Sequence, residues 1–222
     1  SAERRVKQRS SKLLPVYLIR MKTKKPHIEA VLLAAGTSSR MGEVNKLTLD
    51  IQGIPLIRRV ADAIDRSDAA GLTVILGHQA EHVSEALQGI EARFIFNPDY
   101  LYGQSASVQC GVTHLPQPAT DMMVFLADMP FITADVINRL IDAHLQLQDR
   151  WSRITLPSVG GCRANPVIWG EAFFDEIKML SGDTGARALF DTYTSAMNMI
   201  EMDEAHLSLD ADTEEDVMHI RR

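Results

Sequence analysis

The chain has 222 residues, enough for one α/β domain with a sizeable core. Hydrophobic residues make up 45% and charged residues 23% of it, and no apolar run approaches the roughly 18 residues that span a bilayer. Two cysteines, Cys110 and Cys162, form no disulfide framework and lack metal-ligand spacing, so we expect a cytoplasmic protein that binds no membrane.

Charge divides the chain near residue 27. Residues 1–27 hold nine of the 23 basic residues and one of the 29 acidic residues, which leaves a strongly acidic remainder. A basic arm can bind nucleic acid, but no regularly spaced aromatic residues accompany these charges. We therefore interpret 1–27 as a basic arm or the remnant of a preceding domain, and residues 28–222 as one domain. The acidic body argues against a nucleic-acid-binding protein.

From Glu29 onward, apolar runs alternate with amphipathic segments. They predict strands at 29–36, 72–76, 92–97 and 121–128, and helices at 55–67, 81–87, 105–115 and 133–147. After Trp151 the pattern predicts strands at 153–159 and 165–170 around a Gly160-Gly161 turn, and helices at 171–180, 184–193 and 213–220. This rhythm indicates an α/β fold, with a doubly wound, mostly parallel sheet and a Rossmann-like nucleotide-binding half.

A turn follows the first predicted strand, in the stretch LLAAGTSSRMGEVNKL from Leu32 to Leu47. Gly36 lets the backbone come close to a ligand, and the amides after it can bind an anion. Arg40 offers a planar fork for phosphate oxygens, and Lys46 a mobile charge. The spacing fits neither G-x-x-x-x-G-K-[ST] nor G-x-G-x-x-G. We predict a site for a nucleoside triphosphate.

Asp128 ends the very apolar strand predicted at 121–128. A carboxylate there costs solvation free energy unless a cation or hydrogen bonds compensate it. Thr133 is better placed to cap the next helix, so we interpret Asp128 as a ligand of Mg²⁺. The carboxyl ends of neighbouring parallel strands share one edge, and we therefore expect Asp128 and Gly36 to line one crevice.

The stretch around Arg40 resembles the signature G-x-x-x-R-M-G-x-x-x-K of nucleotidyltransferases. Five further blocks follow in order: NPDYLYGQSASVQCGV (97–112), LADMPFIT (126–133), RANPVIWG (163–170), LSGDTGARALF (180–190) and LDADTEEDV (209–217). Together they resemble molybdenum cofactor cytidylyltransferases over about residues 28–222. The resemblance implies the nucleotide-diphospho-sugar transferase type of fold and the transfer of CMP from CTP to molybdopterin, releasing diphosphate. The partners implied are CTP, molybdopterin, a target enzyme of the xanthine dehydrogenase type, and a molybdopterin-binding domain before residue 1.

The resemblance also implies roles for single residues. Arg40 and Lys46 neutralise the triphosphate, and Mg²⁺ is held by Asp128 and by Asp212, with Asp210 a less certain neighbour. An acidic run before a helix also suits the helix dipole, which is the alternative for Asp212. The nucleotide side comprises Leu33, Ala34, Ala35, Gly36, Gly103, Gln104 and Ser107, and the acceptor side Asn165, Gly182, Asp183 and Arg187. Guanylyl enzymes tend to carry Gly-Gly at the position of Ala34-Ala35, so the Ala35 methyl group favours a pyrimidine.

Other functions remain open. A guanylyltransferase and a sugar- or polyol-phosphate cytidylyltransferase share the fold and the triphosphate site. An oxidoreductase of the nicotine-blue type is similar in sequence, but the missing G-x-G-x-x-G does not support a nicotinamide cofactor. A non-catalytic chaperone that holds the cofactor for insertion is a third class. Arg40, Lys46 and Asp128 are all present, which argues against a non-catalytic chaperone.

Overall fold

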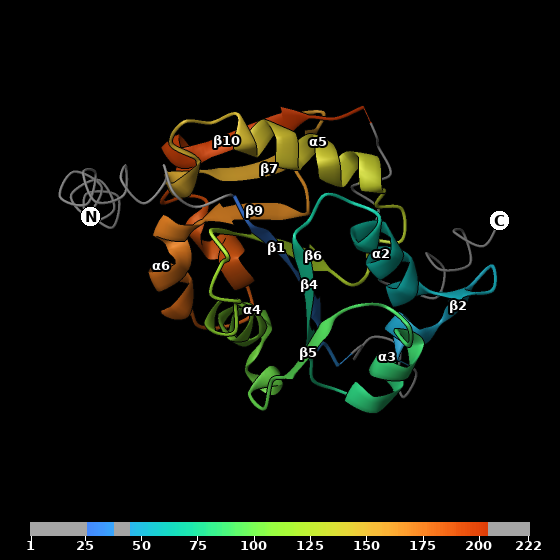
Figure 1. Ribbon diagram of the computed structural model, residues 1–222. Helices are drawn as coiled ribbons and strands as arrows, with labels where there is room; N and C mark the ends of the chain where they lie inside the picture. Colours follow the sequence, from blue (N-terminus) through green and yellow to red (C-terminus); the bar gives the residue numbers. More distant parts are fainter. Residues whose placement is uncertain (1–25, 38–44, 204–222) are drawn as a thin grey trace.

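The structure is a computed structural model and describes residues 26–37 and 45–203. Its central sheet has the strand order β10-β7-β9-β6-β1-β4-β5, and β8 pairs with β7 (Figure 1). The strands are β1 (Ile28–Ala34), β4 (Gly71–Leu76), β5 (Arg93–Phe96), β6 (Asp121–Leu126), β7 (Ile154–Val159), β8 (Cys162–Arg163), β9 (Val167–Gly170) and β10 (Met197–Glu201). The α-helices are α2 (Leu56–Asp65), α3 (Ala80–Ala86), α4 (Gln104–Thr113), α5 (Ala134–Leu145) and α6 (Phe174–Lys178), and a small hairpin, β2 (Asp50–Ile51) with β3 (Ile54–Pro55), precedes α2.

Alternation of side chains along β1 creates two cores, one on each face of the sheet. Every residue of β1 is buried, as expected of a central parallel strand covered on both faces. Leu32 and Ala34 pack in the core formed with α2, α3 and α5. Val31 and Leu33 point the other way, into the core formed with α4 and α6. Figure 1 shows α2 and α3 on one side of the sheet and α4 and α6 on the other.

Strand directions confirm the predicted mostly parallel α/β sheet. β1 is parallel to β4 and to β6, and β4 is parallel to β5. The order β5-β4-β1-β6 is that of a Rossmann-like half, and it reverses between β1 and β6, where such sheets bind ligands. β9 runs antiparallel to both of its neighbours, β6 and β7, because the short Gly160-Gly161 turn leads the chain straight back along β7.

The predicted elements up to residue 180 all occur, with shifted ends. The segment 184–193 differs, because its helical part is a 3-10 helix, Gly185–Leu189, and not an α-helix. Gly185, the first residue of this helix, has a φ of +61°, a left-handed conformation that keeps the helical turn from extending back to Thr184. β10 was not predicted. The helix predicted at 213–220 lies outside the described residues.

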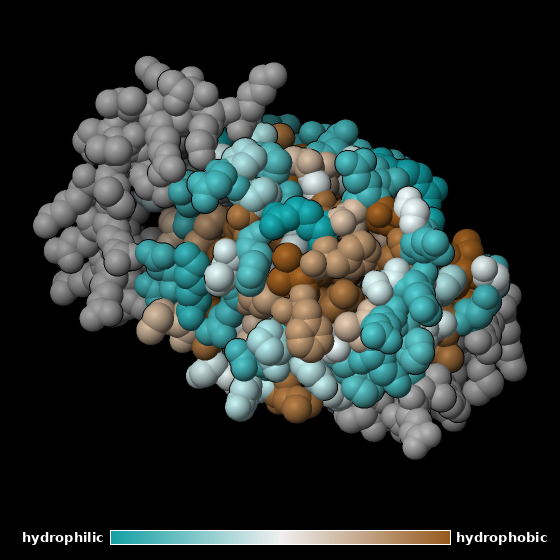
Figure 2. Space-filling view, turned by 60° about the horizontal axis from the view of Figure 1, so that its bottom comes forward, coloured by the Kyte–Doolittle hydropathy of each residue, from teal (hydrophilic) through white to brown (hydrophobic). Residues whose placement is uncertain are grey.

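At the free edge of the sheet, β5 carries exposed hydrophobic side chains. Phe96 is 56% exposed and Leu101, on the turn after β5, is 72% exposed. Figure 2 views the molecule from its lower side in Figure 1, where β5 lies, and shows hydrophobic side chains in the middle of that face. Among the described residues, no helix has the length and apolar character needed to cross a membrane.

A buried polar network lies at the amino end of β6, at the edge of the sheet opposite the carboxyl ends of β1 and β6. His144 of α5 is fully buried and lies 3.0 Å from an oxygen of the buried Asp121 through Nε2. Its Nδ1 lies 2.8 Å from the Thr155 hydroxyl of β7. Thr120 donates to the second Asp121 oxygen at 2.7 Å. The network therefore fixes α5 to two strands by satisfying a buried carboxylate.

Replacing His144 by Ala should cost about 3 kcal/mol of the free energy of unfolding, because it leaves Oδ1 of the buried Asp121 without its hydrogen-bond partner and opens a cavity, while Thr120 and Arg150 stay at Oδ2. Urea unfolding measures this loss. His82→Ala, at an exposed position of α3, is the matched control and should change stability by less than about 0.5 kcal/mol. A loss below about 1 kcal/mol in His144→Ala would show that the network does not stabilise the fold.

Candidate active site

The carboxyl end of β1 is open on the side of the described residues. Gly36 is exposed, and no atom of residues 26–37 or 45–203 lies within 4 Å of the position where its β-carbon would stand. Ala35 is only 3% exposed and packs on Gly77, which follows β4. A β-carbon on Gly77 would lie 2.8 Å from that of Ala35 and 2.7 Å from that of Tyr100. Because position 35 carries a methyl group, position 77 must be glycine. The exposed backbone at Gly36 is accessible to a ligand from the side of the described residues.

Lys46 and Asp128 meet beside this opening. The Lys46 ammonium lies 2.7 Å from Oδ2 of Asp128, although 82 residues separate the two in sequence. Their side chains are 16% and 18% exposed, so the pair is largely shielded from solvent. Lys46 begins a 3-10 helix that Asn45 caps by accepting from the Leu47 amide at 3.1 Å. The buried Leu47 anchors this turn in the core below.

Asp128 has the features of a cation ligand. Its second oxygen, Oδ1, is buried and has no hydrogen-bond partner among the described residues. A buried carboxylate oxygen needs a partner, and a divalent cation such as Mg²⁺ prefers carboxylate oxygens. Residues 26–37 and 45–203 contain no group of three His, Cys, Asp or Glu side chains that could hold a metal by itself. Arg40, Asp210 and the predicted second ligand Asp212 lie outside the described residues.

The amino end of α4 is bound to a loop from the far end of the domain. Gly103 has a φ of +96°, and a β-carbon there would lie 2.9 Å from both the Gly182 carbonyl oxygen and the Asp183 α-carbon. The backbone N–H of Gln104 donates to the Asp183 carboxylate at 3.1 Å, and the backbone N–H of Ser105 donates to the Gly182 carbonyl oxygen at 3.2 Å. Asp183 thus caps α4 from 79 residues away. This contact fixes the predicted nucleotide segment to the predicted acceptor loop.

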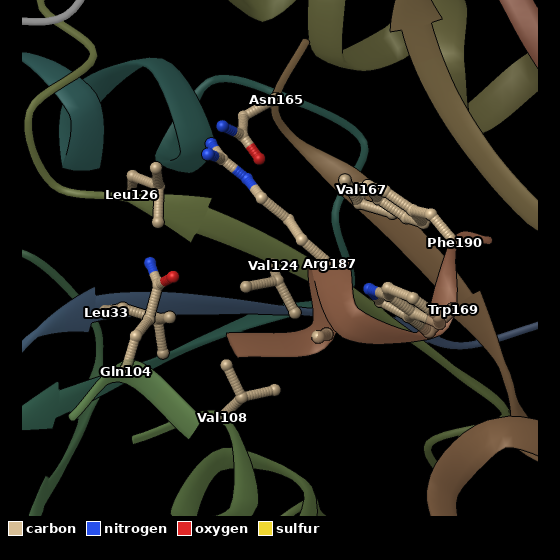
Figure 3. A pocket seen from close by; sticks show the side chains of 11 residues that line it. Leu33, Gln104, Val108, Val124, Leu126, Asn165, Val167, Trp169, Arg187 and Phe190 are labelled. Atoms are coloured by element: carbon tan, nitrogen blue, oxygen red, sulfur yellow. The ribbon is translucent and has the colours of Figure 1, made fainter. Parts of the chain in front are cut away.

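A pocket opens between this loop and the sheet, on the α4 face. It encloses about 310 Å³ of empty space, part of it open to solvent. Figure 3 shows the Arg187 side chain reaching across it toward Asn165, with the Gln104 amide at the other side. The polar lining consists of these three side chains, and the rest is apolar: Leu33, Val108, Val124, Leu126, Val167, Trp169, Ala186 and Phe190. No acidic side chain lines the pocket, so it favours an anionic ligand with a flat or apolar part.

Two aromatic rings form one wall of the pocket. Trp169 and Phe190 are stacked, with centroids 5.6 Å apart and planes 3° from parallel. On Phe190 lies the Arg163 guanidinium, 5.3 Å from the ring centroid. Arg163 also pairs with the exposed Asp191 at 3.7 Å. A second positive charge therefore stands next to the pocket lined by Arg187.

The structure brings the predicted residues together in two groups. Ala34, Ala35, Gly36, Lys46 and Asp128 lie where β1 and β6 end, while Leu33, Gln104, Asn165 and Arg187 share the pocket. Leu33 and Gln104, both predicted for the nucleotide side, thus stand with residues predicted for the acceptor.

Ser107 is 5% exposed, and its hydroxyl accepts a hydrogen bond from Asn97 at 3.3 Å. It therefore positions Asn97, and its predicted contact with the base stays a prediction. Sequence reasoning missed the Trp169–Phe190 wall and Arg163, although all three stand in the blocks RANPVIWG and LSGDTGARALF that marked the region.

Residues 30–197 match the model of the MobA-like NTP transferase domain family. This match spans most of the chain, and the chain belongs to that family. Family and fold support a transferase enzyme of the nucleotidyltransferase class, and the pairing of Lys46 with Asp128 at the end of the central strands is consistent with it.

Two curated relatives cover part of the chain. It is 31% identical over 112 residues to the bifunctional protein GlmU of Caldicellulosiruptor saccharolyticus, an alignment covering 50% of this chain and 24% of that protein. It is 29% identical over 120 residues to the probable molybdenum cofactor guanylyltransferase of Natronomonas pharaonis, covering 50% and 54%. The aligned parts thus span about a quarter to a half of these relatives.

Solved structures show the same fold over nearly the whole domain. Rv0371c from Mycobacterium tuberculosis superimposes with a TM-score of 0.76 at 22% identity, covering 88% of this chain and 98% of that one. A complex of that protein with manganese gives a TM-score of 0.71 at 21% identity, covering 87% and 97%. These identities establish the fold alone.

Replacing Asp128 by Asn should lower turnover by orders of magnitude while the fold survives. The amide keeps the shape of the side chain but removes the charge that holds a cation, and it is cheaper to bury than a carboxylate. Raising the Mg²⁺ concentration should restore only part of the rate. A Mg²⁺ titration of nucleotide turnover, with thermal melts in the absence of metal, measures both effects. Wild-type metal dependence in Asp128→Asn would contradict the assignment.

Proposed function

We propose that the chain transfers CMP from CTP to molybdopterin and releases diphosphate. The observation that carries this proposal is the meeting of Lys46 and Asp128, from two signature blocks, at 2.7 Å beside a pocket with a basic and amide lining. The family supports nucleotidyl transfer in general, and its relatives include a probable molybdenum cofactor guanylyltransferase. The choice of CTP and of molybdopterin rests on the six sequence blocks.

On the nucleotide side, the chain supplies charge and position. In the proposed reaction an oxygen of the acceptor phosphate attacks the α-phosphorus of CTP, and the bond to the diphosphate breaks. Lys46 and Arg40 neutralise the triphosphate and the leaving diphosphate, because phosphoryl transfer needs positioning and charge stabilisation more than covalent chemistry. Asp128 holds a divalent cation, which, when bound, adds positive charge at the phosphate oxygens. The exposed Gly36 lets the backbone amides approach the phosphates.

On the acceptor side, the pocket offers two kinds of contact. Its apolar lining, backed by the buried Trp169 stacked on Phe190, suits a less polar part of the acceptor. The Arg187 guanidinium suits a phosphate, which it can bind through two parallel hydrogen bonds. Asn165 and Gln104 add donors and acceptors between the two. An acceptor that carries a phosphate next to a less polar part, as molybdopterin does, fits this lining, and the choice of a pterin rests on the sequence blocks.

Selection of CTP over GTP is assigned to Ala35. Its methyl group lies against Gly77 at the end of β1, where a guanylyl enzyme tends to carry glycine. A smaller cavity at this position favours the single ring of cytosine.

Asp212, proposed as the second cation ligand, lies outside the described residues, and its assignment rests on the closing sequence block. β6 and β7 are both antiparallel to β9, and β10 is parallel to β7. β10 therefore ends at Glu201, on the same edge of the sheet as Asp128. At this end Ser158 donates a hydrogen bond to Glu201, which lowers the pKa of that carboxyl.

Partners proposed for the whole protein are a preceding molybdopterin-binding domain and a target enzyme of the xanthine dehydrogenase type.

Diphosphate release tests the reaction directly. With molybdopterin present, CTP should release diphosphate faster than GTP, UTP or ATP, and without molybdopterin release should be near background. Ala35→Gly should reduce the preference for CTP over GTP, because it removes the methyl group that narrows the site. Equal or faster release with GTP in the wild-type chain would contradict the choice of nucleotide.

Arg187→Ala should lower kcat/KM for molybdopterin by about 30-fold, the effect of losing roughly 2 kcal/mol from a charged hydrogen bond. The KM for CTP should change little, since Arg187 lies in the acceptor pocket. Steady-state kinetics with each substrate varied in turn separates the two. Arg93→Ala, an exposed position at the start of β5, is the matched control. An effect on CTP alone would move Arg187 to the nucleotide side.

A further inference from the structure

The ion pair between Lys46 and Asp128 joins two groups whose proposed partners differ. Lys46 is assigned to the triphosphate and Asp128 to a divalent cation, yet the two side chains bind each other at 2.7 Å. A charge-assisted contact of this length is among the stronger hydrogen bonds in proteins. With side chains only 16% and 18% exposed, solvent screens it weakly.

Only one carboxylate oxygen of Asp128 is satisfied by Lys46. Oδ2 accepts the ammonium, while Oδ1 is buried without a hydrogen-bond partner in the described part of the chain. The pair therefore neutralises the charge of Asp128 without completing its coordination. Lys46 must leave Oδ2, or stand beside a second positive charge, before Asp128 can hold a cation, and both alternatives cost free energy.

The backbone at Lys46 is fixed, but its side chain can move. Asn45 and Leu47, on either side, are each 4% exposed, and Leu47 belongs to the core. The four-carbon stem of lysine lets the ammonium swing without moving this turn. A triphosphate bound at the end of β1 would offer Lys46 an anionic partner and so release Asp128.

We infer that Lys46 occupies Asp128 as an internal counter-ion, so that the cation binds more tightly once a triphosphate draws Lys46 away. This inference rests on the proposed function, since it assumes that Asp128 holds the cation. Nucleotide and cation binding are then positively coupled, and the chain takes the nucleotide before the cation or together with it. Coupling of this kind is reciprocal and ordinarily amounts to about 5-fold to 150-fold in affinity.

Mn²⁺ binding to the nucleotide-free chain tests the inference without catalysis. Replacing Lys46 by Met removes the charge and keeps a long, flexible side chain. The Lys46→Met variant should bind Mn²⁺ about tenfold more tightly than the wild-type chain, measured by the relaxation of water protons, which detects weak complexes. The double variant Lys46→Met, Asp128→Asn should lose this gain. Lys178→Met removes an exposed lysine of α6, 3.9 Å from Asp175, and should leave Mn²⁺ affinity unchanged.

Three other results would contradict either the inference or the cation assignment. If Lys46→Met stays folded by circular dichroism and binds Mn²⁺ no more tightly than the wild-type chain, the inference is overturned. A gain that persists in the double variant would also overturn it, because the cation would not be on Asp128. If Asp128→Asn turns over CTP with wild-type Mg²⁺ dependence, the cation assignment in the proposed function fails instead, and that assay distinguishes the two failures.

Discussion

Parallel pairing of β1 with strands on both of its sides places the candidate active site. β1 is buried along its whole length between β4 and β6, and Leu33 of β1 stands opposite Leu126 of β6 in the register. The two strands therefore end side by side, which brings the turn at Gly36 next to Asp128. Because the helices that continue from them lie along the faces of the sheet, the edge between the strand ends is left open to a ligand.

Around this edge, long-range contacts join the nucleotide and acceptor regions. Asp183 caps α4 at Gln104, and Gln104 lines the pocket with Arg187. A change in the loop at Gly182 would therefore move the amino end of α4 as well. The buried His144–Asp121 network stabilises the opposite edge of the sheet. Stability and ligand binding thus depend on different ends of the same strands.

Much of this arrangement could be predicted from the sequence. Alternation of apolar runs and amphipathic segments predicts the strands and helices up to residue 180, because each element buries one face or both. The candidate active site was also predicted from the sequence. The signals were glycine at position 36, the basic residues after it, and an acid at the end of an apolar strand. Thr133 was correctly expected to cap α5, where its hydroxyl accepts from the Val136 amide at 3.3 Å.

What the sequence did not predict depends on contacts far apart along the chain. Capping rules are local, so nothing in the sequence near Gln104 indicates a cap from Asp183. Lys46 and Asp128 were assigned to one site, but their pairing depends on the core contacts of Leu47, which hold the turn of Lys46 in place. β10 has only five residues, and none is fully buried, so its pattern is weak. The left-handed φ of Gly185, at the start of the 3-10 helix 185–189, is a backbone angle that composition does not fix.

The central claim is that a nucleoside triphosphate and a divalent cation bind where β1 and β6 end. A crystal structure of the wild-type chain with CTP and Mn²⁺ tests it most directly, because the anomalous signal of manganese locates the cation independently of the protein phases. The account predicts a manganese peak within ligand distance of Asp128, roughly 2.0–2.6 Å, and the Lys46 ammonium on a phosphate oxygen. Nucleotide bound elsewhere, or bound here with the Lys46–Asp128 pair intact and no manganese on Asp128, would contradict it.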